Sequence, residues 1–321
     1  MKKYPLKISY AAKTALWAGK RLSEEYGKIS EHDRISETWE LSVRRDDEAV
    51  VLCGEAQGMK LSEYFDACGY DCVTPTYKKG DRFPLLIKLI DADDTLSVQV
   101  HPDDAYAASV ENDSGKTEAW HIISACEGAK IIYGLREGTT REALERAIKE
   151  ERVEDVMKYQ SVKAGQTYFI PAGMVHAIGK GILIAEVQQN SDLTYRLYDY
   201  GRVGADGKQR ELHIEKSLDV ARAFDEKEIE NLRFARGKIC PGGELLVNSE
   251  YFSAVKYTVD GALTLNVDSD SFTSLLCIEG EGEIEEGGEK YAVGKGDSYF
   301  CPAGLGTLCV RGSLTLIASR V

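Results

Sequence analysis

Apolar and polar residues alternate over short segments along most of the 321-residue chain, and glycine or proline separates these segments. A period of two is the pattern of a strand with one buried face, so the chain is predicted to be mainly β. The pattern is densest from about residue 235 to the end, where glycines near residues 280, 287 and 295 mark tight turns. Many short strands with frequent turns indicate a β-sandwich or barrel.

Helical spacing is confined to short segments. Residues 61–67 form one candidate, and another begins at Thr139, where Thr-Thr-Arg-Glu is a capping-box sequence ahead of helically spaced apolar residues. A further helical turn is predicted over residues 154–159 and a helix over residues 214–224. We therefore expect a β fold with a few short helices.

An internal repeat divides the chain. Residues 165–173 and residues 296–304 both read glycine, a short strand containing Tyr-Phe, and then Pro-Ala-Gly. Three residues after the first copy stands His176, and three residues after the second stands Thr307. The repeat predicts two related β units, over residues 1–234 and 235–321. If His176 binds a metal, the second unit has lost that ligand and is expected to be metal-free.

Composition narrows the classes of function. The chain has 40 lysines and arginines against 53 aspartates and glutamates, a net charge of −13. This charge argues against a nucleic acid or an anionic membrane as partner, although a few local cations can still bind a small phosphate. We identify no bilayer-spanning apolar run and no signal peptide, and the eight cysteines lack a disulfide or zinc-knuckle spacing. A cytoplasmic protein with reduced, mostly buried thiols is expected.

Residues 96–102 form a strand-like segment whose polar side chains lie on one face. Ser97, Gln99 and His101 alternate with two valines, so the polar residues share a face and the valines share the other. Pro102 ends the strand or places it at an edge. Such a strand suits the lining of a small barrel with a wet mouth.

A second polar face and a turn histidine complete a set of metal donors. Lys116, Glu118 and Trp120 share a face of the next strand-like segment, and His176 follows the Pro-Ala-Gly turn. With Gln99 and His101, these segments offer two imidazoles, one carboxylate and one amide oxygen. That set suits zinc or another divalent transition metal. The alternative, hydrogen-bonded core histidines, is less favoured because each histidine has other donors beside it.

Lys88 stands alone in the apolar run Phe-Pro-Leu-Leu-Ile-Lys-Leu-Ile. A buried ammonium without a partner is costly, so the side chain either reaches the rim or belongs to a site. We favour the site, because the strand leads towards Gln99. Arg196 lies among tyrosines, where stacking on an aromatic ring is the structural alternative.

Several of these motifs resemble the type I phosphomannose isomerases of the cupin superfamily. The spacing from Gly165 to His176 looks like the second cupin motif, and Gln99-x-His101 followed by Glu118 is typical of this family rather than of other cupins. Residues 186–202 and 207–213 are also similar to the family. The resemblance covers roughly residues 4–220, and the degenerate second unit fits the short bacterial form.

The resemblance implies two cupin jelly-roll units, the second degenerate, and a zinc-dependent interconversion of mannose 6-phosphate and fructose 6-phosphate without a nucleotide cofactor. The large helical insertion of longer members would be reduced here to residues 139–159. One zinc ion per chain would bind Gln99, His101, Glu118 and His176. The active-site basic residues of the family map onto Lys88, Lys116 and Arg196.

The proton-transfer base is open between Lys88 and Glu186. Burial near a metal and Arg196 would depress the pKa of Lys88, whereas a partly buried Glu186 would have its pKa raised towards neutrality. We lean to Lys88. Arg196 is expected to stabilise transition-state charge. Ser97, Lys116 and Arg202 are expected to bind substrate.

Two other functions remain open from the residues. Two histidines and a carboxylate could hold iron in a cupin oxygenase, although Gln99 and the extra cations argue against it. A non-catalytic sugar-binding cupin is the other alternative. The partner expected is a small sugar phosphate, for a chain that is a monomer or a homodimer.

Overall fold

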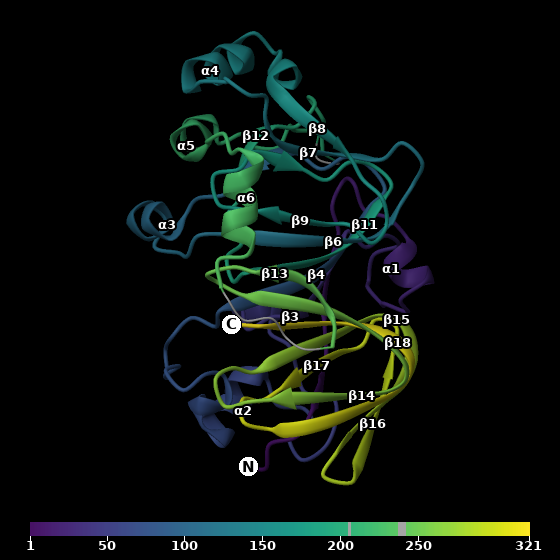
Figure 1. Ribbon diagram of the computed structural model, residues 1–321. Coiled ribbons are helices and arrows are strands. Elements are labelled where there is room, and N and C mark those ends of the chain that lie inside the picture. Colours follow the sequence, from purple (N-terminus) through teal and green to yellow (C-terminus); the bar gives the residue numbers. More distant parts are fainter. Residues whose placement is uncertain (205–206, 237–241) are drawn as a thin grey trace.

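A computed structural model describes residues 1–204, 207–236 and 242–321 (Figure 1). Within these residues the strands form three sheets, of six, five and seven strands. Most of the short helices lie around the first two sheets, whereas the third sheet lies below them in Figure 1 with helix α2 (Leu61–Cys68) beside it. The predicted mainly β fold with a few short helices is confirmed.

The first sheet runs through the middle of the protein and carries much of the main core. Its central strands are buried along their whole length, because one face meets the second sheet and the other meets the rest of the core. In spatial order its strands are β2 (Ala11–Lys13), β3 (Glu37–Leu41), β4 (Leu85–Ala92), β11 (Ile182–Gln189), β6 (Glu118–Ala125) and β9 (Thr167–Ile170).

The second sheet contains the strand predicted to have a polar face and the short strand that follows the cupin turn. Val98 and Val100 of this sheet pack with Leu144 and Leu218 from helices on its outer side, so the apolar face of this strand is covered by protein. Its order is β12 (Tyr195–Tyr198), β5 (Val98–Val100), β10 (His176–Ala177), β7 (Lys130–Leu135) and β8 (Met157–Ser161), and the helices around it are α3 (Asp104–Val110), α4 (Arg141–Lys149) and α5 (Ile214–Val220).

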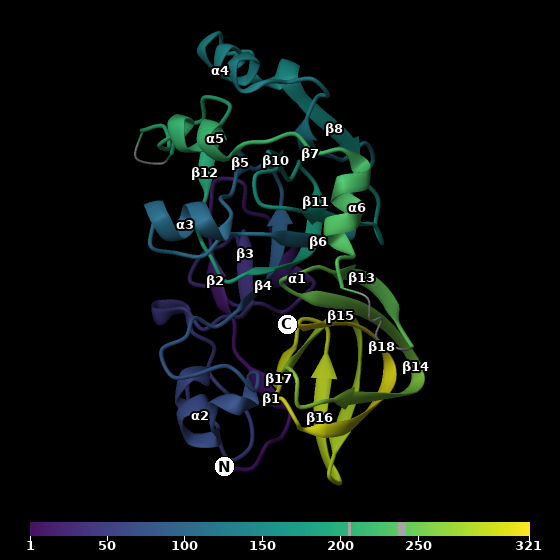
Figure 2. The same cartoon turned by 60° about the vertical axis from the view of Figure 1, so that its left-hand side comes forward.

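The third sheet holds the C-terminal strands and one strand from the N-terminus. β1 (Leu6–Ile8) pairs with β17, with Leu6 opposite Phe300. The two ends of the chain are therefore joined through this sheet (Figure 2). Its order is β1, β17 (Ser298–Cys301), β15 (Thr273–Glu286), β18 (Gly306–Arg320), β14 (Ser253–Val267) and β13 (Glu244–Asn248), with β16 (Glu289–Gly294) paired to β15. The division at residues 234 and 235 stays a prediction.

The internal repeat has the same backbone form in both copies. The first glycines, Gly165 and Gly296, have φ of 86° and 89°, and the last, Gly173 and Gly304, have φ of 88° and 74°. Residues other than glycine rarely adopt positive φ angles of this size, so glycine is favoured at both turns. β9 pairs with β6 in the first copy as β17 pairs with β15 in the second.

Beyond the second copy, Thr307 is exposed and the next residue, Leu308, is buried in the apolar core of the third sheet. An apolar side chain therefore occupies the interior next to the position that the repeat aligns with His176.

The predicted helices are confirmed in part. α2 (Leu61–Cys68) and α5 lie where expected, although α5 ends at Val220 rather than near residue 224. α4 starts at Arg141, and its cap lies one residue later than predicted, because Thr140 rather than Thr139 accepts the capping hydrogen bond, from the Ala143 amide. The prediction of a helical turn over residues 154–159 is wrong. A 3₁₀ turn ends at Val156, and the following residues form β8 because they pair with β7. α1 (Arg21–Glu24), α3 and α6 (Glu226–Arg233) were not predicted.

Two further expectations can be compared with the described residues. No helix among them has the length and apolar character needed to span a membrane. The seven cysteines described are unpaired, but of these Cys72, Cys277 and Cys301 alone are fully buried, and Cys126 is exposed. Cys240 lies outside the described residues.

Candidate metal centre and active site

The predicted metal donors converge between the first two sheets. His176 on β10 lies opposite Gln99 on β5, and His101 follows two residues after Gln99 on the same face. Glu118 starts β6 in the facing sheet. His101, Glu118 and His176 are each at most 1% exposed, and their donor atoms lie within 4.8 Å of one another.

Two of the distances among these donors match those of a tetrahedral zinc site. The two Nε2 atoms of His101 and His176 are 3.1 Å apart, and His101 Nε2 lies 3.2 Å from Glu118 Oε1. Two atoms bound to zinc at about 2.0–2.1 Å in a tetrahedron lie roughly 3.3 Å apart. His176 Nε2 lies 3.8 Å from the other oxygen of this carboxylate, Glu118 Oε2, and with one donor atom taken from each residue all three lie within 4.8 Å of one another.

The tautomer of His176 presents a lone pair to this centre. Its Nδ1 lies 2.8 Å from the Met174 carbonyl oxygen, which can only accept a hydrogen bond, so the proton is on Nδ1 and Nε2 is free to bind a metal. Burial lowers the pKa of His176, and burial together with Lys116 lowers the pKa of His101 to about 3. Both imidazoles are therefore neutral, as metal ligands must be.

Lys116 lies inside the donor cluster. Its Nζ is 2.9 Å from Glu118 Oε1 and 3.3 Å from His101 Nε2, and its side chain is 5% exposed. Burial disfavours an ionised Glu118, but the Lys116 ammonium and His101 hold the pKa of that carboxyl well below its usual range. The centre thus offers two neutral nitrogens and one carboxylate, with a cation beside them.

A row of side chains crosses the first sheet next to the donors. Trp39 on β3 lies opposite Lys88 on β4, Lys88 lies opposite Glu186 on β11, and Glu186 lies opposite Trp120 on β6. Residues directly opposite each other share a face, so all four side chains point to the same side of the sheet as Glu118. The sequence could not show this row, because its members come from four strands.

Lys88 has two carboxylates as partners, one of which was not predicted. Its Nζ lies 3.5 Å from Glu37 Oε2 and 3.6 Å from Glu186 Oε2. Burial by itself lowers the pKa of Lys88, but Glu37 and Glu186 hold it above its usual value. The expected depression of the Lys88 pKa is therefore wrong. Glu37 has no local signal in the sequence other than its alternation with Trp39.

Glu186 has the properties expected of a proton-transfer base. Burial, followed by the nearby charge of Glu118, raises the pKa of Glu186 to about 7. Its side chain is 4% exposed and its Oε1 accepts a 2.8 Å hydrogen bond from Trp120 Nε1. A carboxyl that titrates near neutrality can both accept and release a proton at physiological pH.

Arg196 lies in the second sheet opposite Gln99, two strands from His176. Its Nη1 donates to the Glu211 carbonyl oxygen at 2.8 Å, and its buried Nε has no hydrogen-bond partner among the described residues. Arg196 therefore keeps donor capacity close to the metal donors.

Ser97 and Arg202 lie on the same side of the protein as Arg196. Ser97 is buried two residues before Gln99, and Arg202 Nη1 donates to the neighbouring Thr95 carbonyl oxygen. Arg202 and Arg210 both bind the Asp199 carboxylate. Arg196 lies near both arginines and near Asp199, and Asp94 and Glu211 add two further carboxylates to this cluster of charges.

Comparison with known proteins agrees with this geometry. A family model for the type I phosphomannose isomerase catalytic domain matches residues 7–126, and one for the cupin domain of mannose-6-phosphate isomerase matches residues 244–321. The chain is 38% identical to mannose-6-phosphate isomerase ManA of Bacillus subtilis over 99% of both chains, and 36% identical to mannose-6-phosphate isomerase of Streptococcus mutans over 98% of both. The chain belongs to the type I mannose-6-phosphate isomerase family.

Solved structures of this family share the fold. The crystal structure of mannose 6-phosphate isomerase from Bacillus subtilis superposes with a TM-score of 0.87 at 32% identity, over the whole of both chains. A variant of phosphomannose isomerase from Salmonella typhimurium superposes with a TM-score of 0.79 at 14% identity, over 98% of both chains, which shows the fold alone. The predicted cupin fold is therefore confirmed.

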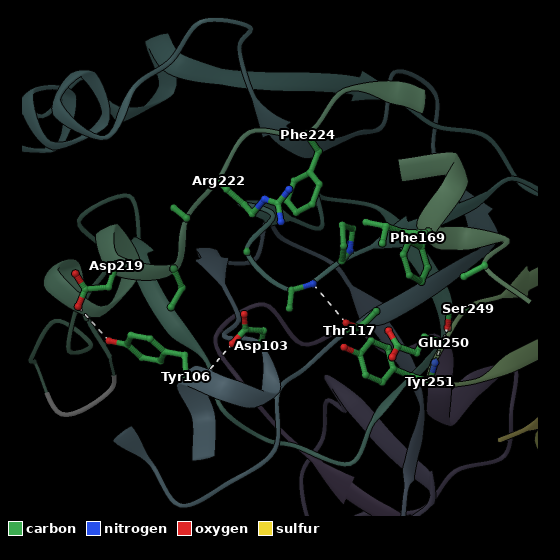
Figure 3. Close-up of a pocket in the computed structure, with 17 residues that line it drawn as sticks. Asp103, Tyr106, Thr117, Phe169, Asp219, Arg222, Phe224, Ser249, Glu250 and Tyr251 are labelled. Atoms are coloured by element: carbon green, nitrogen blue, oxygen red, sulfur yellow. Dashed lines mark hydrogen bonds between the residues drawn. The ribbon is translucent and has the colours of Figure 1, made fainter. Parts of the chain in front are cut away.

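A separate cavity of 430 Å³ lies behind the cupin turn (Figure 3). Thr117 and Phe169 line it together with Asp103, Asp219 and Glu250, none of which belongs to the predicted site of this family member. Thr117 directly precedes Glu118, the first residue of β6, and its side chain faces this cavity rather than the metal donors. The cavity is thus distinct from the metal centre.

Proposed function

We propose that this protein interconverts mannose 6-phosphate and fructose 6-phosphate by proton transfer between carbons 1 and 2 of the open-chain sugar. The observation that carries the proposal is the placement of the donor triad His101, Glu118 and His176 beside a buried carboxyl, Glu186, whose pKa is raised to about 7. A metal centre next to a base of this kind can carry out an aldose–ketose isomerisation, because the metal stabilises the enediolate oxygen and the base moves the proton.

We propose zinc as the metal, one ion per chain, held by His101, Glu118 and His176 with Gln99 as the fourth ligand. Two neutral imidazoles, one carboxylate and one amide oxygen are ligands that zinc accepts. When bound, zinc would polarise the sugar carbonyl and lower the energy of negative charge on its oxygen. Gln99 is included because it lies opposite His176 on the same face of the sheet.

We assign the base to Glu186 rather than to Lys88. From aldose to ketose, a base removes a proton from carbon 2 and returns one to carbon 1, while a hydroxyl proton moves from the oxygen on carbon 2 to the oxygen on carbon 1. Glu186 ionises near pH 7 and can do both. Lys88, held as an ammonium between Glu37 and Glu186, orients Glu186 and supplies positive charge.

Four other side chains are proposed to bind the substrate. Arg196 and Lys116 would stabilise charge that develops during proton transfer, since both are cations near the donor triad. Ser97 and Arg202 would bind the phosphate, because a guanidinium and a hydroxyl can both donate hydrogen bonds to phosphate oxygens.

A coupled assay with mannose 6-phosphate tests the function. Purified protein should turn over the substrate, lose activity after chelation and regain it when zinc is returned. Glucose 6-phosphate, which differs at carbon 2, is the matched control and should react far more slowly. Turnover that survives complete removal of metal would contradict the proposal.

The cellular setting is also part of the proposal. Unpaired cysteines and the absence of a membrane-spanning helix among the described residues support a cytoplasmic enzyme. Two units, over residues 1–234 and 235–321, with a short helical insertion near residues 139–159, would act as a monomer or a homodimer. Light scattering at several concentrations measures the oligomeric state.

A further inference from the structure

Trp120 donates one hydrogen atom to two carboxylates at once. Its indole Nε1 lies 3.0 Å from Glu118 Oε2 and 2.8 Å from Glu186 Oε1. The side chain is 1% exposed, and its ring packs edge-on against His176 with ring centroids 5.3 Å apart. One indole therefore contacts two proposed metal ligands, Glu118 and His176, and the proposed base, Glu186.

Each of the two carboxylates has Trp120 at one oxygen and a lysine at the other. Glu118 accepts from Trp120 on Oε2 and faces Lys116 at 2.9 Å on Oε1. Glu186 accepts from Trp120 on Oε1 and faces Lys88 at 3.6 Å on Oε2. Buried carboxylates are costly unless each oxygen has a donor or a cation, and two neighbouring carboxylates also repel each other. The shared N–H offsets both costs at the point where the two groups meet.

Trp39 is the matching residue at the other end of the same row. It lies opposite Lys88, and its Nε1 donates to Glu37 Oε1 at 2.9 Å. Both tryptophans therefore donate to a carboxylate that faces Lys88. They differ in that the Trp120 indole also donates to a member of the donor triad, Glu118.

We propose that Trp120 is a positioning residue whose single N–H, shared between Glu118 and Glu186, fixes the metal-binding carboxylate and the proton-transfer base relative to each other. The inference rests on the proposed function for the roles of Glu118 and Glu186. An indole N–H can only donate, so it cannot compete with these carboxylates for a cation or a proton. A hydrogen-bond partner that orients a metal ligand typically contributes 10- to 100-fold to metal affinity.

The first test observes the shared hydrogen bond directly in the wild-type protein. The chain has three tryptophans, so a proton–nitrogen spectrum should contain three indole signals. Zinc added to chelator-treated protein should shift the Trp120 signal, and Glu186→Gln should shift the same signal in metal-free protein. The Trp39 signal should respond to zinc much less. A Trp120 signal that ignores either change overturns the proposal.

The second test compares matched variants. Trp120→Phe keeps an aromatic ring and removes the donor, so its zinc dissociation constant, measured by competition with a chelator, should rise 10- to 100-fold. Trp39→Phe makes the same change at the other end of the row and should stay within about threefold of wild type. Wild-type affinity in Trp120→Phe, or equal weakening in both variants, overturns the proposal, because equal weakening indicates lost packing.

A spectroscopic measurement separates positioning from a general loss of structure. With cobalt(II) in place of zinc, the visible absorption bands should change in Trp120→Phe and remain unchanged in Trp39→Phe. If Trp120→Phe does not fold, the indole spectra of the wild-type protein decide the question. None of these measurements uses a substrate. A wild-type protein that lacks isomerase activity would therefore overturn the proposed function, while the Trp120 bridge would be judged separately.

Discussion

Lys88 and Glu186 face each other across two antiparallel strands, with Lys88 Nζ 3.6 Å from Glu186 Oε2 and both side chains at most 5% exposed. Glu37 lies on the other side of the same ammonium. The pair is therefore part of a three-membered arrangement in which one buried cation is shared by two carboxylates. This arrangement makes Lys88 a poor proton acceptor and leaves Glu186 as the group that titrates near neutrality.

The roles of these two residues can be separated by substitution. Glu186→Gln should still bind zinc but should lower kcat by about 10²- to 10⁴-fold, the usual contribution of a general base. Exchange of solvent deuterium into carbon 2 should be lost in parallel. Near-normal turnover by Glu186→Gln together with an inactive, metal-loaded Lys88→Met would return the role of base to Lys88.

The acid limb of the pH–rate profile should move in opposite directions when the two neighbours of Glu186 are changed. Lys88 lowers the pKa of Glu186, so Lys88→Met should shift the rise of kcat/KM to higher pH. Glu37 raises that pKa, so Glu37→Gln should shift the rise to lower pH. Shifts in the same direction would contradict the assignment of this limb to Glu186.

Glu186 should also affect the pH dependence of stability in the metal-free protein. Its pKa is about 7 when folded and near 4.5 when unfolded, so the folded state binds more protons between these values and loses stability as the pH rises through them. Each unit of pKa difference corresponds to about 1.4 kcal/mol, which gives on the order of 3 kcal/mol in total. Glu186→Gln should therefore gain stability over wild type from pH 4.5 to pH 8, as measured by urea unfolding.

The metal site should depend on both histidines of the triad. Replacing His101 or His176 by alanine should remove bound zinc and activity together, because either change leaves too few donors for a closed site. His121→Ala is the matched control: this histidine lies on β6, the strand of Glu118, but it contacts Thr167 at 2.9 Å and its replacement should leave the zinc content unchanged. Full zinc occupancy in His176→Ala would refute the ligand assignment.

Arg196→Ala should lower kcat more than it raises KM. Loss of a donor to transition-state charge costs about 3 kcal/mol, or roughly a hundredfold in rate, by analogy with oxyanion-hole donors. Steady-state kinetics at saturating metal measures both constants. A rise in KM with unchanged kcat would make Arg196 a phosphate anchor, a role that we assign to Arg202.

The C-terminal unit should remain without metal even when a histidine is returned to it. Thr307 is exposed and Leu308 is the buried neighbour, so Thr307→His places an imidazole in solvent rather than in the interior of the unit. Metal analysis should still find one zinc ion per chain. A second zinc ion per chain in Thr307→His would show that the interior of this unit can form a metal site.

The sequence by itself determined the mainly β fold, because strand periodicity and glycine turns are local properties that survive in every context. It also indicated the candidate donors, because alternation places Gln99 and His101 on one face of a strand. The packing of two sheets decided that His176 and Glu118 meet them. Lys88 could be singled out from its sequence alone, because an ammonium in an apolar strand requires a partner.

Only the tertiary structure decided which residues are the partners of Lys88. The pKa of Lys88 depends on Glu37 and Glu186, which lie on β3 and β11, 51 residues before and 98 residues after it in the chain. Strand order brings these charges within 4 Å, and no local pattern encodes strand order. The same is true of Trp120: its alternation with Glu118 is visible in the sequence, but its second acceptor, Glu186, arrives from a neighbouring strand. Electrostatic interactions depend on distance in space, so the sequence showed which groups could ionise and the fold decided how they do.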